Sequence, residues 1–203
     1  MTSAGDPSSR ALYHYLKAGT QRALDPVVAR VLIGIHPNVL TGLGVLSAAA
    51  AGGCLWRGWY LAAVPCILLR MLLNVADGQV ARRTGKTSRA GAVWNEFSDR
   101  LADIGLFGGA ALAAPAGLAL GLATLAAVEL VSYLGILPQT LGLARQYGGV
   151  SAKIPRQIAL MIAAAGQGIW GGSWLRVGLI VIALGALLTV GQRLRSAFRE
   201  ARA

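Results

Sequence analysis

Six apolar stretches, each long enough or nearly long enough to cross a bilayer as a helix, constrain this chain more than any other feature. We place them at about residues 39–56, 59–82, 90–113, 116–143, 154–174 and 177–193. Backbone polar groups cannot be left unpaired in hydrocarbon, so spans of this composition should be helices. Of the 203 residues 55% are hydrophobic and only 13% are charged, which excludes a soluble enzyme and a disordered, collagen-like or coiled-coil chain. The sequence predicts an all-α integral membrane protein with six transmembrane helices.

The distribution of basic residues predicts the orientation of these helices. The formal net charge is +11, which in a soluble protein would suggest nucleic acid as a partner. Here the basic residues lie between apolar runs, so we expect an anionic membrane face and no nucleic acid. Fifteen fall in segments on one side, against Arg57 and Arg176 on the other. By the positive-inside rule both termini are expected in the cytoplasm, in a bacterial-type inner or plasma membrane.

Composition also suggests a division of the chain into three parts. Residues 1–38 are expected to be a cytoplasmic juxtamembrane segment, because residues 9–33 show a patchy helical period with Lys17 and Arg22 opposite apolar positions. This pattern favours an interfacial amphipathic helix, with a poorly ordered arm as the alternative. Residues 39–196 form the expected membrane domain, and residues 197–203 a basic cytoplasmic tail.

Acidic residues concentrate where the second and third predicted spans meet. Asp77, Glu96, Asp99 and Asp103, four of the eight acids, lie within 27 residues of one another. Each charge in a membrane helix costs about 2.5–3.5 kcal/mol on insertion scales, so such residues are functional candidates by default. For Asp77 and Asp99 the structural alternative is a buried ion pair. Helical spacing places Arg100 where it can offset Glu96, and leaves Asp77 and Asp99 without an obvious partner.

Oxygen ligands from two helix faces predict a metal site here. Asn74 and Asp77 are three residues apart, and Asn95 and Asp99 are four apart, so each pair shares a face. Converging oxygen ligands suit a hard divalent cation such as Mg²⁺ or Mn²⁺. A basic stretch follows, placed where an anionic phosphate would arrive from the cytoplasm; it comprises Arg82, Arg83, Lys86 and Arg89. For Arg83 and Lys86 we favour the alternative, in which they only anchor the helix ends on the cytoplasmic side.

These residues carry a family resemblance. The segment Asp77-Gly78, Ala81-Arg82, Gly91 and Asp99 resembles the signature of the CDP-alcohol phosphotransferase (CDP-alcohol phosphatidyltransferase) family. That signature has two acids three apart, Gly, two residues, Ala-Arg, about eight residues, Gly, and two acids four apart. It covers about 26 residues, and the six-helix layout extends the likeness over most of the chain.

The resemblance implies transfer of a phosphatidyl (substituted phosphate) group in phospholipid biosynthesis. An alcohol attacks the β-phosphorus of a CDP-linked donor, commonly CDP-diacylglycerol, and CMP leaves. It implies that Asp99 is the base that takes the hydroxyl proton, that Asp77 is a metal ligand, and that members are homodimers in contact with membrane lipids. The residues that it implies at the CDP pocket are Gly78, Ala81, Arg82 and Gly91.

The chain departs from the signature at Asn74 and Asn95, where the family normally has aspartates. An amide oxygen can still ligate Mg²⁺ but brings no charge, so Asn74, Asp77, Asn95 and Asp99 remain the candidate ligands of one ion or two. We therefore keep a catalytically altered or non-catalytic member, which binds CDP-lipid or a membrane partner, as the alternative function. A small transporter is disfavoured because the acids cluster at one end and no repeat is present. The acceptor alcohol stays open.

Overall fold

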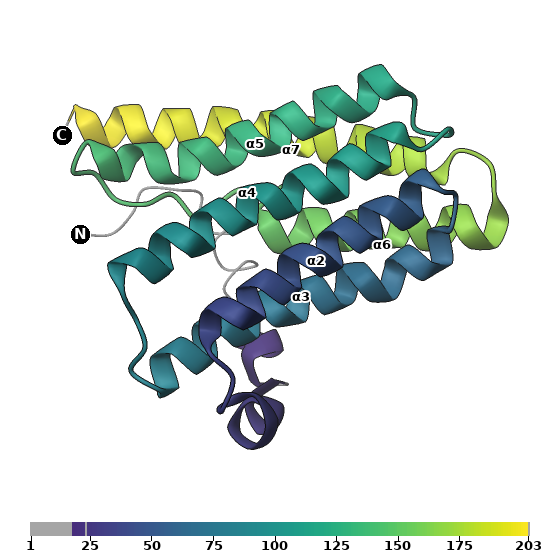
Figure 1. Cartoon of the computed structure of the whole chain (residues 1–203). Helices are drawn as coiled ribbons and strands as arrows, with labels where there is room; N and C mark the ends of the chain where they lie inside the picture. The colour runs from purple at the N-terminus through teal and green to yellow at the C-terminus, as the bar shows by residue number, and fades with distance from the viewer. Residues whose placement is uncertain (1–17, 23, 203) are drawn as a thin grey trace.

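The computed structural model describes residues 18–22 and 24–202, and this part of the chain folds into helices without a strand. A short π-helical segment, η1 (Val28–Leu32), precedes six long α-helices (Figure 1). They are α2 (Pro37–Trp56), α3 (Tyr60–Arg83), α4 (Arg89–Leu112), α5 (Leu118–Thr140), α6 (Lys153–Trp170) and α7 (Trp174–Ala201).

Each of the six predicted spans corresponds to one of these helices, so the all-α architecture is confirmed. Within the described residues, four helices are long and apolar enough to cross a membrane by length and composition, namely α2, α3, α5 and α7. The other two are more polar: α4 carries Glu96, Asp99 and Asp103, and α6 begins with Lys153. Helix α7 runs on to Ala201, well past residue 193, where the last apolar stretch ends.

Local sequence explains where several helices begin and end. Pro37 is the first residue of α2, where its missing N–H costs nothing, and the His36 side chain accepts a hydrogen bond from the Asn38 N–H at 3.3 Å. The Ser88 hydroxyl accepts one from the Gly91 N–H at 2.9 Å and caps α4. Gly171, with φ of 67°, ends α6 in a conformation that side chains rarely adopt.

The six helices pack as a closed ring in which each has its main backbone contacts with two others. The order around the ring is α2, α3, α6, α7, α5 and α4. Glycine allows the closest approach, between α2 and α4: a Cβ on Gly52 would stand 2.0 Å from the Gly105 carbonyl oxygen. Small residues at such crossings are typical of helix packing in lipid.

The described part of the N-terminal segment packs against one end of this ring. Leu24 and Val28 form an apolar cluster with Leu40, Ala76 and Val80 of α2 and α3. The predicted interfacial helix over residues 9–33 lies partly outside the described residues, and Lys17 lies wholly outside them. Residues 18–22 and 24–32 of this segment are helical.

Candidate active site

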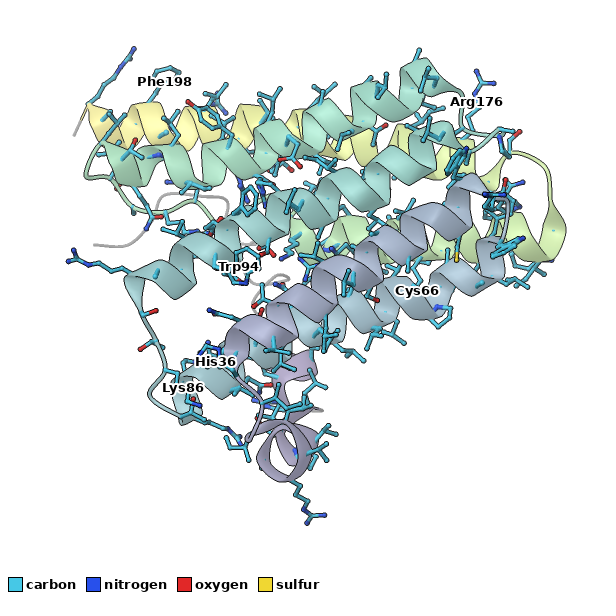
Figure 2. The ribbon with its side chains drawn as sticks, viewed as in Figure 1. His36, Cys66, Lys86, Trp94, Arg176 and Phe198 are labelled. Atoms are coloured by element: carbon cyan, nitrogen blue, oxygen red, sulfur yellow. The ribbon has the colours of Figure 1, made fainter. Side chains whose placement is uncertain are left out.

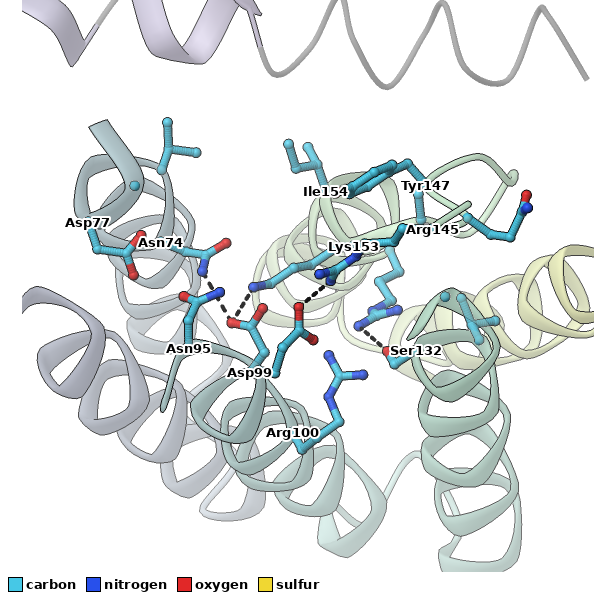
Figure 3. A pocket seen from close by; sticks show the side chains of 18 of the residues that line it. Asn74, Asp77, Asn95, Asp99, Arg100, Ser132, Arg145, Tyr147, Lys153 and Ile154 are labelled. Carbon is cyan, nitrogen blue, oxygen red and sulfur yellow. Dashed lines mark hydrogen bonds and ion pairs between the residues drawn. The ribbon is translucent and has the colours of Figure 1, made fainter. Parts of the chain in front are cut away.

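A cavity of about 310 Å³ opens among α3, α4, α5, α6 and α7 and contains most of the predicted site. Asn74, Asp77, Asn95 and Asp99, from α3 and α4, all line it, and Figure 3 shows the two pairs facing each other. Gly78 and Arg82 line it as well, whereas Ala81 and Gly91 are not among its lining residues. The two oxygen-bearing helix faces predicted from spacing therefore line one cavity.

Asp77 is buried on α3, at 5% exposure, and is held by α2. Its Oδ2 accepts a hydrogen bond from the Thr41 hydroxyl at 2.7 Å. Thr41 also donates to the Pro37 carbonyl one turn earlier, at 3.1 Å. The hydrogen bond from Thr41 therefore occupies Oδ2 of Asp77, and Oδ1 is the carboxylate oxygen that Thr41 does not bind.

Asp99 has partners that helical spacing did not reveal. Its Oδ1 accepts from Arg70 Nη2 of α3 at 2.7 Å and lies 2.5 Å from Lys153 Nζ of α6. Asn74 Nδ2 donates to the same oxygen at 3.1 Å (Figure 3). The expectation that Asp99 lacks a partner is therefore wrong, because both cations come from distant positions in the chain. None of these three contacts uses Oδ2.

Lys153 begins α6, one residue before the stretch 154–174 that we expect in the membrane. Its side chain is 20% exposed where it lines the cavity. Burial lowers the pKa of its ammonium group to about 8, while Asp99 acts to raise it. Near pH 7 the group is therefore largely a cation.

The remaining acids are also paired across helices. Glu96 forms an ion pair with Arg145, not with Arg100 as the spacing predicted. Arg100 instead lies 3.6 Å from Asp103 and 3.7 Å from Glu129 of α5, because its side chain reaches the neighbouring helix. Asp103 is fully buried and also pairs with Arg156 of α6 at 2.5 Å.

The cavity as a whole has a cationic lining. Six basic side chains line it against three carboxylates; the basic ones are Arg82, Arg100, Arg145, Lys153, Arg156 and Arg193. Of these, Arg82 was connected with the site from the sequence, whereas Arg193 was missed. Its position at the end of the last apolar stretch was the available signal. This lining suits anionic groups such as phosphates.

Gly78 and Arg82 form a distinct part of the wall. A Cβ on Gly78 would lie 3.2 Å from Arg82 Nη1, so the glycine lets the guanidinium fold across its face. Arg82 and Gln21 also line a second cavity of about 310 Å³, beside the N-terminal segment. This second cavity adds Arg22 and Arg83, with Arg83 bound to Asp25 at 2.9 Å. The basic surface thus continues from one cavity to the other.

The donor set fits one divalent ion better than two. Among the described residues, no three His, Cys, Asp or Glu side chains are grouped to hold a metal. Asp99 Oδ1 is already shared by two cations and an amide, which leaves Asp77 as the carboxylate available to an ion, with amide oxygens from Asn74 and Asn95.

The two ends of the ring differ in chemistry. Lys86, on the α3–α4 connection, and Arg176, on α7, lie at opposite ends of the molecule (Figure 2). The end opposite the cavity carries exposed tryptophans where α2 ends, before α3 begins and around the α6–α7 turn; they are Trp56, Trp59, Trp170 and Trp174. Tryptophan gathers at membrane–water interfaces.

Comparison with known proteins shows the family to which this chain belongs. The chain matches the family model of CDP-alcohol phosphatidyltransferases over residues 34–191. It is 30% identical over 203 aligned residues to the phosphatidylinositol phosphate synthase of Streptomyces avermitilis. This alignment covers 93% of this chain and 83% of that protein.

Solved structures of the phosphatidylinositol phosphate synthase of Mycobacterium tuberculosis share the fold. The structure with CDP-DAG bound has a TM-score of 0.72 at 24% identity, covering 91% of this chain and 94% of that one. A complex with manganese and citrate has a TM-score of 0.72 at 25% identity, covering 90% and 88%. Members of the family use Mg²⁺ or Mn²⁺. The resemblance carried by the signature is therefore confirmed, and the chain belongs to the CDP-alcohol phosphatidyltransferase family, as an integral membrane transferase of phospholipid biosynthesis.

Proposed function

We propose that this protein transfers a phosphatidyl group from a CDP-linked lipid, CDP-diacylglycerol in the first instance, to an alcohol that carries a phosphate, and releases CMP. The observation that carries the proposal is the cavity in which Asp77, Asp99 and Arg82 of the signature meet further cations from α6, α7 and the α5–α6 connection. A lining of six cations against three carboxylates can hold two anionic substrates. The relative from Streptomyces avermitilis, named for phosphatidylinositol phosphate, supports a phosphorylated polyol as the acceptor.

We place the donor on the α3–α4 side of the cavity. Gly78 gives its diphosphate close access to the α3 backbone, and Arg82 lies beside it as a guanidinium partner. The nucleotide end extends toward the second cavity, which Arg82 and Gln21 also line. A Mg²⁺ or Mn²⁺ ion held by Asp77, with Asn74 and Asn95, would supply positive charge to the diphosphate. Ala81 and Gly91 support this wall from outside the cavity lining.

We place the acceptor on the side of α5, α6 and α7. The guanidinium carbon of Arg145 lies 5.2 Å from the centre of the Tyr147 ring, within the segment that connects α5 to α6. Arg193 of α7 donates to the Gly148 carbonyl of the same segment at 3.0 Å, so this segment positions both guanidinium groups. These guanidinium groups bind the acceptor's phosphate and direct its hydroxyl toward Asp99.

Asp99 is the proposed base, acting through Oδ2. It takes the proton of the acceptor hydroxyl as that oxygen forms a bond to the β-phosphorus of the donor. The bond between this phosphorus and the CMP oxygen breaks, and CMP leaves with the electron pair. Lys153 and Arg82 stabilise the charge that develops on the phosphate oxygens, and the proton on Asp99 returns to water through the open cavity.

Six spans with both termini and the cavity on the cytoplasmic side are part of the proposal. The closed ring, the fifteen-to-two distribution of basic residues and the tryptophans at the opposite end support it. The N-terminal segment, described from residue 18 on, would then lie along the cytoplasmic surface as an amphipathic helix. We keep the homodimer implied by the resemblance as a prediction.

The test is CMP release by purified protein in lipid nanodiscs. CDP-diacylglycerol and Mg²⁺ or Mn²⁺ are supplied with inositol phosphate, glycerol phosphate, inositol or serine, one at a time. We expect CMP with a phosphorylated acceptor and little with its unphosphorylated counterpart. CDP binding without CMP release for any acceptor would instead support the alternative, a non-catalytic member that binds CDP-lipid, which the double pairing of Asp99 favours.

A further inference from the structure

The structure places two fixed cations at Asp99. Arg70 is 1% exposed, does not line the cavity, and approaches Asp99 Oδ1 at 2.7 Å. Lys153 lines the cavity and approaches the same oxygen at 2.5 Å (Figure 3). The Nε and Nη1 atoms of Arg70 are buried with no hydrogen-bond partner among the described residues, so its charge acts mainly on Asp99.

The charges of this centre balance before any metal binds. Asp77 and Asp99 contribute two negative charges, while Arg70 and Lys153 contribute two positive ones. The diphosphate of a CDP-linked lipid brings two further negative charges, which one divalent ion neutralises. A second divalent ion would add two further positive charges to a partly buried site that already holds Arg82 at the diphosphate, and burying unpaired charge is costly.

The contacts of the candidate metal ligands also indicate a single divalent ion. Asn74 donates its Nδ2 to Asp99, so only its amide oxygen is left for an ion, and it adds no negative charge that a second ion would need. Lys153 supplies positive charge beside Asp99 at the cavity wall, which is the contribution that a second ion would make. An ammonium group can serve phosphate there as a point charge with three donors.

We propose that the Lys153 ammonium group, held against Asp99, takes the place of a second divalent ion, so that this protein binds its CDP-linked donor with a single Mg²⁺ or Mn²⁺. This inference rests on the proposed function and assigns Lys153 to the donor's diphosphate. Arg70 is a positioning residue, which holds Asp99 from the side away from the cavity so that Lys153 is kept in place.

The experiment counts Mn²⁺ ions and measures CDP affinity on the same samples. Purified full-length protein is titrated with Mn²⁺ in the presence of CDP, with free Mn²⁺ read by electron paramagnetic resonance and CDP binding by calorimetry. We expect one Mn²⁺ per chain for the unaltered protein. A count of two or of none would overturn the inference.

Variants then test the role of Lys153. Lys153→Met should weaken CDP binding at saturating Mn²⁺ by about 10- to 100-fold, the range for a lost charge-assisted hydrogen bond, with the count still one. Lys153→Arg should restore most of this affinity. The matched control is Lys86→Met, because Lys86 is exposed on the α3–α4 connection and lies outside the cavity; it should change neither value. Unchanged affinity in Lys153→Met would overturn the inference.

A combined variant tests the substitution directly. Asn74→Asp, Asn95→Asp and Lys153→Met together rebuild four carboxylates and remove the competing cation, so we expect two Mn²⁺ per chain with CDP. A count of one in folded protein would contradict the assignment. Failure of the unaltered protein to bind CDP at all would overturn the proposed function and this inference with it, whereas CDP binding with two ions would overturn the inference alone.

Discussion

The closest helix contact in the ring gives a prediction that connects packing with catalysis. A Cβ on Gly52 of α2 would stand 2.0 Å from the Gly105 carbonyl oxygen of α4 and 2.9 Å from its carbonyl carbon. Carbon and oxygen atoms do not approach closer than about 3 Å, so Gly52→Ala requires α2 and α4 to separate by about 1 Å. The two Gly105 atoms that the new Cβ would meet are both backbone atoms, so no side-chain rotation can relieve the overlap.

The separation should affect stability and turnover together. Overpacking of this kind typically costs about 1–3 kcal/mol. Asp99 precedes Gly105 by six residues on α4, and Thr41, which binds Asp77, lies on α2. A displacement of about 1 Å at reacting groups can lower turnover by about 100-fold. We therefore expect Gly52→Ala to unfold at a lower temperature and to release CMP about 10- to 100-fold more slowly.

Gly53→Ala is the matched control for this prediction. Gly53 is the next residue on the same helix, and a Cβ there meets nothing within 4 Å. The same chemical change should therefore leave thermal stability and CMP release near the values of the unaltered protein. Thermal unfolding in detergent and CMP release in nanodiscs measure the two quantities. Equal behaviour of the two variants would refute the reasoning from the α2–α4 contact.

The remaining predictions concern the site and its orientation. Asp99→Asn should lower turnover by about 10²- to 10⁴-fold and CDP affinity much less, because a positioned base acts only on the reaction; equal losses in both would contradict its role. Asp77→Asn should instead weaken Mn²⁺ binding and turnover together, measured by metal-titrated CMP release. EDTA should weaken CDP binding by the unaltered protein, and unchanged affinity would show that the basic side chains hold the nucleotide without metal. A cysteine introduced at Lys86 should be labelled only from the cytoplasmic side and one at Arg176 only from the other, with the reverse pattern refuting the orientation.

The sequence was sufficient to predict the helices because their signal is local. Long apolar stretches in lipid have to be helical, and a helix covers each of the six, with bounds within a few residues of those expected except at the end of α7. The signature residues line one cavity, and spacing predicts the shared face within each pair, because Asn74 and Asp77, like Asn95 and Asp99, are about one helical turn apart.

The electrostatic partners could not be predicted in the same way. Arg70 and Lys153 lie 29 and 54 positions from Asp99, and only the ring packing of α3, α4 and α6 brings them together. The spacing rule failed for Arg100 because the carboxylate of Glu129 on α5 competes with Glu96 on its own helix. Helical spacing treats one helix at a time, whereas these pairs depend on which helices are neighbours.

The most direct test of the account compares CMP and product lipid in one reaction. Unaltered protein in nanodiscs is given CDP-diacylglycerol, Mg²⁺ and the phosphorylated acceptor that releases most CMP, and the lipids are identified by mass spectrometry. We predict one phospholipid containing the acceptor for every CMP, with both products falling together in Asp99→Asn. CMP without that phospholipid would mean hydrolysis of the donor, and neither product despite CDP binding would mean a binding protein; either result would contradict transfer to an alcohol.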